Sequence, residues 1–175
     1  MRRVRRLLSA AAVGIAVVCA VSACSDGSQV SGRLPDGAAS AQAAGLDRWS
    51  DAMNAALLDD DHGFGSSSGV GTGGAGTETP GGDWDILVAC NGVDGKTIRV
   101  YTGPDARDQL VHVDVPCGIV TRLPVTVPRV GGLTVQVRTL PGASEAVRRG
   151  EVVSYWYVSI VKTGFEPKSR DYEVG

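Results

Sequence analysis

The sequence predicts an all-β fold: a small antiparallel β-sandwich, or an Ig-like or jelly-roll domain, with one disulfide. A single amphipathic helix and a disordered tether are expected to precede this domain. Three observations carry this prediction. Between residues 83 and 163, apolar and polar residues alternate in six short runs, which is the period of a β-strand. Turn residues (Gly, Pro and Asp) separate the runs. Cys90 and Cys117 lie within the same stretch.

The N-terminus has the form of a lipoprotein signal peptide, residues 1–23. A cluster of four arginines precedes an apolar run that is shorter than the about 20 residues a membrane-spanning helix needs. The run ends in Val21-Ser22-Ala23-Cys24, which is the pattern of a bacterial lipobox. We therefore predict that Cys24 carries the lipid (diacylglycerol and an acyl chain such as palmitate) and anchors the protein to the extracytoplasmic face of the cell membrane. An ordinary signal-peptidase site is the alternative.

Net charge excludes two classes of partner. The chain has 17 basic and 19 acidic residues, and removal of the signal peptide with its four arginines leaves 13 basic against 19 acidic. A mature chain with a net charge of −6 has no basic footprint for nucleic acid. It also lacks the basic clusters that hold a protein on anionic lipid by electrostatics.

The four cysteines divide by position. Cys19 leaves with the signal peptide and Cys24 takes the lipid, so Cys90 and Cys117 remain in the exported domain. Oxidising compartments allow disulfides to persist, and two cysteines permit one intrachain pairing. We predict the Cys90–Cys117 disulfide. Two free thiols or half of a metal site are the alternatives, although neither cysteine belongs to a CxxC pair.

Four segments are predicted besides the signal peptide and the β domain of residues 83–163. Residues 24–45 are rich in Ser, Gly and Ala and are expected to be a disordered spacer. Apolar residues at steps of three and four, among them Trp49 and Met53, predict an amphipathic helix over residues 46–61. Residues 62–82 are rich in Gly and Ser and predict a flexible linker. Residues 164–175 form a C-terminal tail. The β domain would thus be held on a tether of roughly 60 residues, counting the helix within it.

The lipobox, the tether and two short motifs together resemble a group of proteins. Trp84 is followed by Cys90 and Gly92, and a later Val-x-Cys-Gly comprises Val115, Cys117 and Gly118. This arrangement is similar to that of small lipoproteins of high-GC actinobacteria. The resemblance implies a disulfide-pinned β-sandwich, and it brings no known catalytic residues to this chain.

Two polar clusters are candidates for a catalytic or metal site. His112 and Asp114 share one face of a predicted strand, where they could orient a base or bind a metal with a third ligand. Consecutive aspartates and a histidine at residues 59–62 could attract a divalent cation, but they lack the alternating spacing of a calcium loop. A solvated strand face and a solvated acidic run are the favoured interpretations, so we predict no catalytic residue and no metal ligand.

Aromatic residues offer the other candidate for a ligand contact. Tyr155 and Tyr157 should share one face of the last strand and Trp156 the other. One face could be an exposed platform for a sugar ring, with Trp84 as a further contact. Because the strand is apolar on both faces, packing on both sides is favoured, with the amphipathic helix as one cover.

The sequence thus favours a non-enzymatic, membrane-anchored extracytoplasmic protein without a cofactor, which binds an envelope protein or another envelope ligand. The first alternative is a module that binds carbohydrate or cell-wall polysaccharide through exposed aromatic residues. The second is a hydrolase or metal-dependent enzyme that uses His112 and Asp114.

Overall fold

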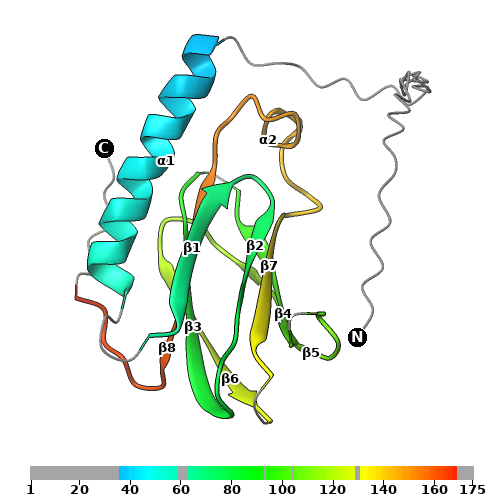
Figure 1. Ribbon diagram of the computed structural model, residues 1–175. Helices are drawn as coiled ribbons and strands as arrows, with labels where there is room; N and C mark the ends of the chain where they lie inside the picture. Colours follow the sequence, from blue (N-terminus) through cyan, green and yellow to red (C-terminus); the bar gives the residue numbers. More distant parts are fainter. Residues whose placement is uncertain (1–35, 59–62, 93, 104, 129–130, 169–175) are drawn as a thin grey trace, which may run out of the picture. The chain divides into compact units, whose positions relative to one another are not determined.

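The computed structural model describes residues 36–58, 63–92, 94–103, 105–128 and 131–168. In these residues eight strands form two four-stranded sheets, and every strand pairing is antiparallel (Figure 1). Sheet A has the order β1 (Gly65–Val70), β8 (Tyr155–Lys162), β3 (Gly82–Cys90), β6 (Val120–Val127). Sheet B has the order β2 (Gly73–Thr77), β7 (Leu133–Thr139), β4 (Lys96–Thr102), β5 (Gln109–Val115). Two helices, α1 (Asp36–Leu57) and α2 (Glu145–Arg148), complete the elements. The predicted all-β fold with a preceding helix is confirmed.

The main core lies between the two sheets. Alternation along each strand sends one set of side chains inward, and these form a single buried cluster. Its largest members are Trp84 on β3 and Trp156 on β8, which are 5% and 3% exposed. The predicted strands of residues 83–163 therefore supply most of the core, as the period-two pattern indicates.

A second buried cluster lies on the outer face of sheet A, where α1 packs. Trp49, Met53 and Leu57 of the helix contact outward-facing residues such as Leu87 on β3 and Tyr157 on β8. Figure 1 shows α1 running alongside sheet A. Apolar side chains on both faces of β8 are thus explained, because one face enters the sandwich core and the other supports the helix.

The bounds of α1 differ from those predicted. The helix begins at Asp36, not at residue 46, and it ends at Leu57, before the aspartates of residues 59–61. Its first turns comprise an alanine-rich stretch whose composition is typical of a spacer. Alanine is also the strongest helix former, so this stretch can continue the helix toward the N-terminus. The prediction of a disordered spacer through residue 45 is therefore wrong for residues 36–45.

The predicted linker of residues 62–82 was also wrong, since it contains β1 and β2. Two of its glycines lie where the backbone comes close to the Trp156 indole. A Cβ at Gly69 or Gly73 would lie 2.6 or 2.4 Å from Cζ2 of that ring. Two serines of β1 bond to α1, since Ser66 donates to Asn54 at 3.0 Å and Ser68 bonds to Ser50. The composition typical of a linker here serves close packing and interlayer hydrogen bonds.

The disulfide prediction is confirmed, and the proline within β6 lies where prolines in sheets are tolerated. Pro124 is on the edge strand of sheet A, which pairs with one neighbouring strand of that sheet. Cys90 and Cys117 form a disulfide with a Cα–Cα distance of 4.7 Å. The disulfide joins the end of β3 to the segment that crosses from β5 in sheet B to β6 in sheet A. We call this part of the sandwich the disulfide end.

Candidate functional site

The aromatic residues that were candidates for a ligand platform are packed inside the protein. Trp84 and Trp156 lie in the core between the sheets, and Tyr157 is 1% exposed beneath α1. Tyr155 is half-buried, stacks on Trp49 with ring centroids 6.5 Å apart, and donates from its hydroxyl to the Gln42 carbonyl. The structure leaves no broad ring face open at these four positions, and core packing accounts for them.

His112 and Asp114 do lie on one exposed face, the outer face of sheet B. Asp114 accepts a hydrogen bond from the Thr97 hydroxyl on the neighbouring strand at 2.7 Å. His112 lies directly opposite Arg99 in the register, and among the described residues no hydrogen bond joins it to the Asp114 carboxylate. Across the described residues, no group of three or more His, Cys, Asp or Glu side chains could hold a metal ion. The acidic residues 59–61 and His62 lie outside the described part of the chain.

A lysine is buried at the start of β4. Lys96 is 1% exposed, and its Nζ donates to the Gly71 carbonyl at 3.1 Å. Burial lowers the pKa of Lys96 below its ordinary value, while the nearby Asp94 carboxylate acts to raise it. The amine ties the turn between β1 and β2 to the start of β4, so its hydrogen bond has a structural role.

The segment after β8 crosses the outer face of sheet A as a strap, which we define as residues 163–168. The Asp85 carboxylate on β3 is 3% exposed, pairs with Arg122 on β6, and accepts from the Gly164 amide at 3.1 Å. Arg122 donates in turn to the Phe165 carbonyl. Lys168 donates its amide to the Ala56 carbonyl at the last turn of α1. The strap thus closes the space between α1 and β6, and this part of the predicted tail is bonded to the domain.

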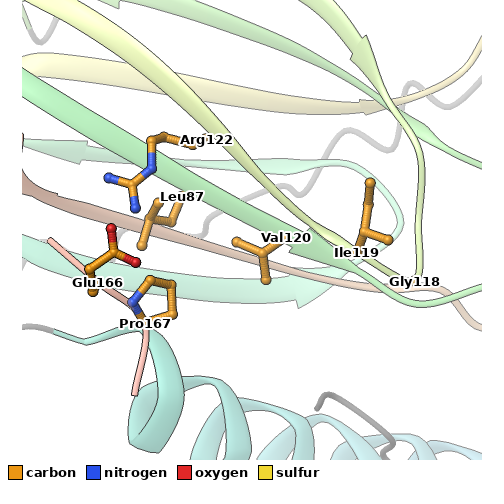
Figure 2. Close-up of a pocket in the computed structure, with 7 residues that line it drawn as sticks. All are labelled: Leu87, Gly118, Ile119, Val120, Arg122, Glu166 and Pro167. Carbon is orange, nitrogen blue, oxygen red and sulfur yellow. The ribbon is translucent and has the colours of Figure 1, made fainter. Parts of the chain in front are cut away.

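A groove lies between the strap and the start of β6. Its volume is about 310 Å³, and its lining combines apolar side chains with one basic and one acidic residue: Leu87, Gly118, Ile119, Val120, Arg122, Glu166 and Pro167. Figure 2 shows Arg122 and Glu166 toward one end, Ile119 toward the other, and Leu87 and Val120 between them. The groove is therefore apolar along its middle and charged at the strap.

Exposed apolar side chains gather at the same end of the sandwich. Four large apolar residues are clearly exposed among those described, and three of them follow this pattern: Ile119 at 57%, Val152 at 42% and Val153 at 38%. Strand register brings the end of β3 beside the starts of β6 and β8, because Ala89 pairs with Val120 and Cys90 with Trp156. The three residues therefore lie at the disulfide end. No sequence pattern predicted them, because the register determines which loops meet.

The predicted lipid site at Cys24 lies outside the described residues and stays a prediction. Within the described residues, neither helix is long and apolar enough to cross a membrane.

Comparisons with known proteins give structural similarities only. No protein-family model and no curated protein sequence matches this chain. The structure is similar to PliG from Aeromonas hydrophila, a periplasmic inhibitor of g-type lysozyme, with 19% identity over 59% of this chain and 91% of that one and a TM-score of 0.39. It is also similar to the CBM22-1–GH10 modules of Clostridium thermocellum xylanase 10B, with 13% identity, 64% and 29% coverage and a TM-score of 0.31. A third similarity is to a structure of infectious bursal disease virus, with 13% identity, 65% and 32% coverage and a TM-score of 0.23. This chain spans about a third or less of those last two.

Proposed function

We propose that this chain is a lipid-anchored, extracytoplasmic binding protein without enzymatic activity, and that it contacts a protein of the cell envelope through its disulfide end. Cys24 would hold it at the membrane, and the sandwich would present Ile119, Val152 and Val153 to the partner. The single observation that carries the proposal is the gathering of exposed apolar side chains at that end.

The composition of this surface fits a protein contact. Protein interfaces combine a desolvated apolar centre with a polar rim. The groove beside Ile119 has an apolar middle and ends at Arg122 and Glu166. Apolar patches that are rimmed by polar residues commonly mark sites of interaction.

Other features support an exported, non-catalytic role. The Cys90–Cys117 disulfide suits an oxidising compartment. Catalysis by acid–base or nucleophilic chemistry needs a nucleophile, a base and an orienting group within hydrogen-bond reach. His112 and Asp114 supply a histidine and a carboxylate, but no hydrogen bond joins them in the described part of the chain, and the carboxylate bonds to Thr97 instead.

Site-specific photocrosslinking in the intact lipoprotein tests the contact surface. A photoreactive residue at position 119 or 153, in cells that carry the protein in its membrane, should give one discrete crosslinked product. The matched control is position 126, an exposed threonine on the same strand as the groove residues but farther from the disulfide end. Equal crosslinking from all three positions, or none from 119 and 153, would contradict the proposal.

Introduction of a negative charge into the apolar patch provides a second, independent measurement. Ile119→Asp should abolish the crosslinked product that forms through position 153. Because Ile119 is more than half exposed, the melting temperature should stay within about 2 °C of wild type. Retention of the product in this variant would show that the partner does not contact the disulfide end.

A further inference from the structure

The outer face of sheet B carries a hollow that no interaction described above occupies. It has a volume of about 430 Å³. Its lining comprises residues 74–77 of β2, the following Glu78, and residues 134–136 of β7. The outward positions of β2 are Gly74 and Gly76, which pair with Gln136 and Thr134. The hollow therefore exists because the outward positions of β2 carry no side chains. At Gly74 a side chain would not fit without a shift, since its Cβ would lie 2.6 Å from the Val135 carbonyl oxygen.

An unpaired guanidinium lies one strand beyond the hollow. Arg99 of β4 is directly opposite Gln136 on one side and His112 on the other. Adjacent strands are about 4.8 Å apart, so a group that extends from the hollow across Gln136 reaches Arg99. Among the described residues Arg99 forms no ion pair, and its Nε is buried without a hydrogen-bond acceptor. A buried donor without a partner is unfavourable, and the acceptor group of a ligand would satisfy it.

Neighbouring charges define how much negative charge this site can take. Arg138 already donates to the Gln136 amide oxygen at 3.3 Å, and Asp114 accepts from Thr97 on the same face. Glu78 lies at the rim of the hollow. Two guanidiniums and two carboxylates thus lie on this face, and since Arg99 is the guanidinium without a partner among the described residues, the face suits a ligand with a single negative charge. The planar fork of an arginine matches a carboxylate through two parallel hydrogen bonds.

Remaining groups around the hollow suit a hydroxylated ring. Thr134 and Gln136 supply a hydroxyl and an amide group, and the glycine backbone leaves an apolar floor. Tyr101, which pairs with Thr134 on the far side of β7, adds a half-buried aromatic ring beside Arg99. We propose that the outer face of sheet B binds a carboxylate-bearing saccharide, with one sugar ring in the hollow over Gly76 and the carboxylate on Arg99.

Calorimetric titration of the full-length chain in detergent tests this site. The probes are galacturonic acid, which carries one carboxylate on one sugar ring, its uncharged methyl ester, and galactose 6-phosphate. Loss of a charge-assisted pair should make the ester bind about 10- to 100-fold more weakly than the acid. Arg99→Gln should remove the difference between acid and ester. Arg149→Gln, which changes an arginine that is paired with Glu145 near α2, should leave binding unchanged.

A second variant tests the hollow itself. At Gly76 a Cβ would meet only ordinary contacts, the closest at 3.8 Å from Thr134 Oγ1. Gly76→Val should therefore keep or raise the melting temperature while it weakens binding of the acid by about tenfold or more. The proposal is overturned if no probe binds, if acid and ester bind equally, if the sugar phosphate binds more tightly than the acid, or if either variant binds like wild type. These outcomes are independent of the contact at Ile119, which belongs to the other sheet.

Discussion

The two sheets of the sandwich differ in what lies on their outer faces. Sheet A presents Leu87, Tyr157 and other apolar residues outward, and α1 covers them. Sheet B presents arginines, a histidine, threonines and a glutamine, and no described element covers them. An antiparallel sheet needs one buried face only, so the second buried face of sheet A requires the helix. The comparison shows that α1 is part of the folded unit and that sheet B provides the open face.

The largest effect on stability should come from removing a buried side chain at the contact between α1 and sheet A. Tyr157→Ala removes a ring that is 1% exposed and whose hydroxyl donates to Asn54 at 2.8 Å. Loss of a buried aromatic side chain should lower the free energy of unfolding by about 3–5 kcal/mol, as measured by urea denaturation. Tyr101→Ala on the outer face of sheet B is the matched control and should cost about 1 kcal/mol. Similar losses in the two variants would mean that the outer faces do not differ in the way described.

An intermediate effect is expected from the strap that crosses sheet A. Arg122→Leu leaves the Asp85 carboxylate, which is 3% exposed, with the Gly164 amide as its remaining hydrogen-bond partner among the described residues. Because Arg122 itself is 35% exposed, water offsets part of the loss, and we expect a cost of about 1.5–3 kcal/mol. Limited proteolysis should then cleave within residues 163–168 faster than in wild type. The double variant Asp85→Asn/Arg122→Leu should recover part of the stability, and a further loss would contradict this explanation.

The smallest effect on stability is expected on sheet B. Arg99→Gln removes a guanidinium that makes no described hydrogen bond or ion pair, so the free energy of unfolding should change by at most about 0.5 kcal/mol. Thermal denaturation in the absence of saccharide measures this. A loss above about 2 kcal/mol would show that Arg99 stabilises the fold, and its assignment to ligand binding would then lose its basis.

Strands with strong side-chain patterns were predictable, and strands without them were not. Period-two alternation along β3 and β7 predicted their inward faces. Composition could not predict β1 and β2, because glycine and serine favour disorder in general and become strand residues only against a specific neighbour. That neighbour is the indole of Trp156, more than 80 residues along the chain from Gly73.

The sequence could not show which aromatic residues are exposed or where a hollow lies, for a related reason. Exposure of an aromatic residue depends on which layers cover it, and the sequence does not show that α1 covers Tyr157 or that Gly69 covers Trp156. The hollow on sheet B arises from a pairing between glycines of β2 and polar residues of β7, which only the register reveals. His112 was correctly placed on an exposed face, but its neighbour Arg99 was not recognised.

Docking of α1 has a consequence for how far the protein can reach. If Cys24 is the lipid site, the chain between the anchor and the first residue of α1 comprises residues 24–35, a small part of the roughly 60 residues expected from composition. Twelve residues span at most about 40 Å when fully extended. The sandwich would then operate within one protein diameter or so of the bilayer surface. A partner would have to be a membrane neighbour or a molecule that comes close to the membrane.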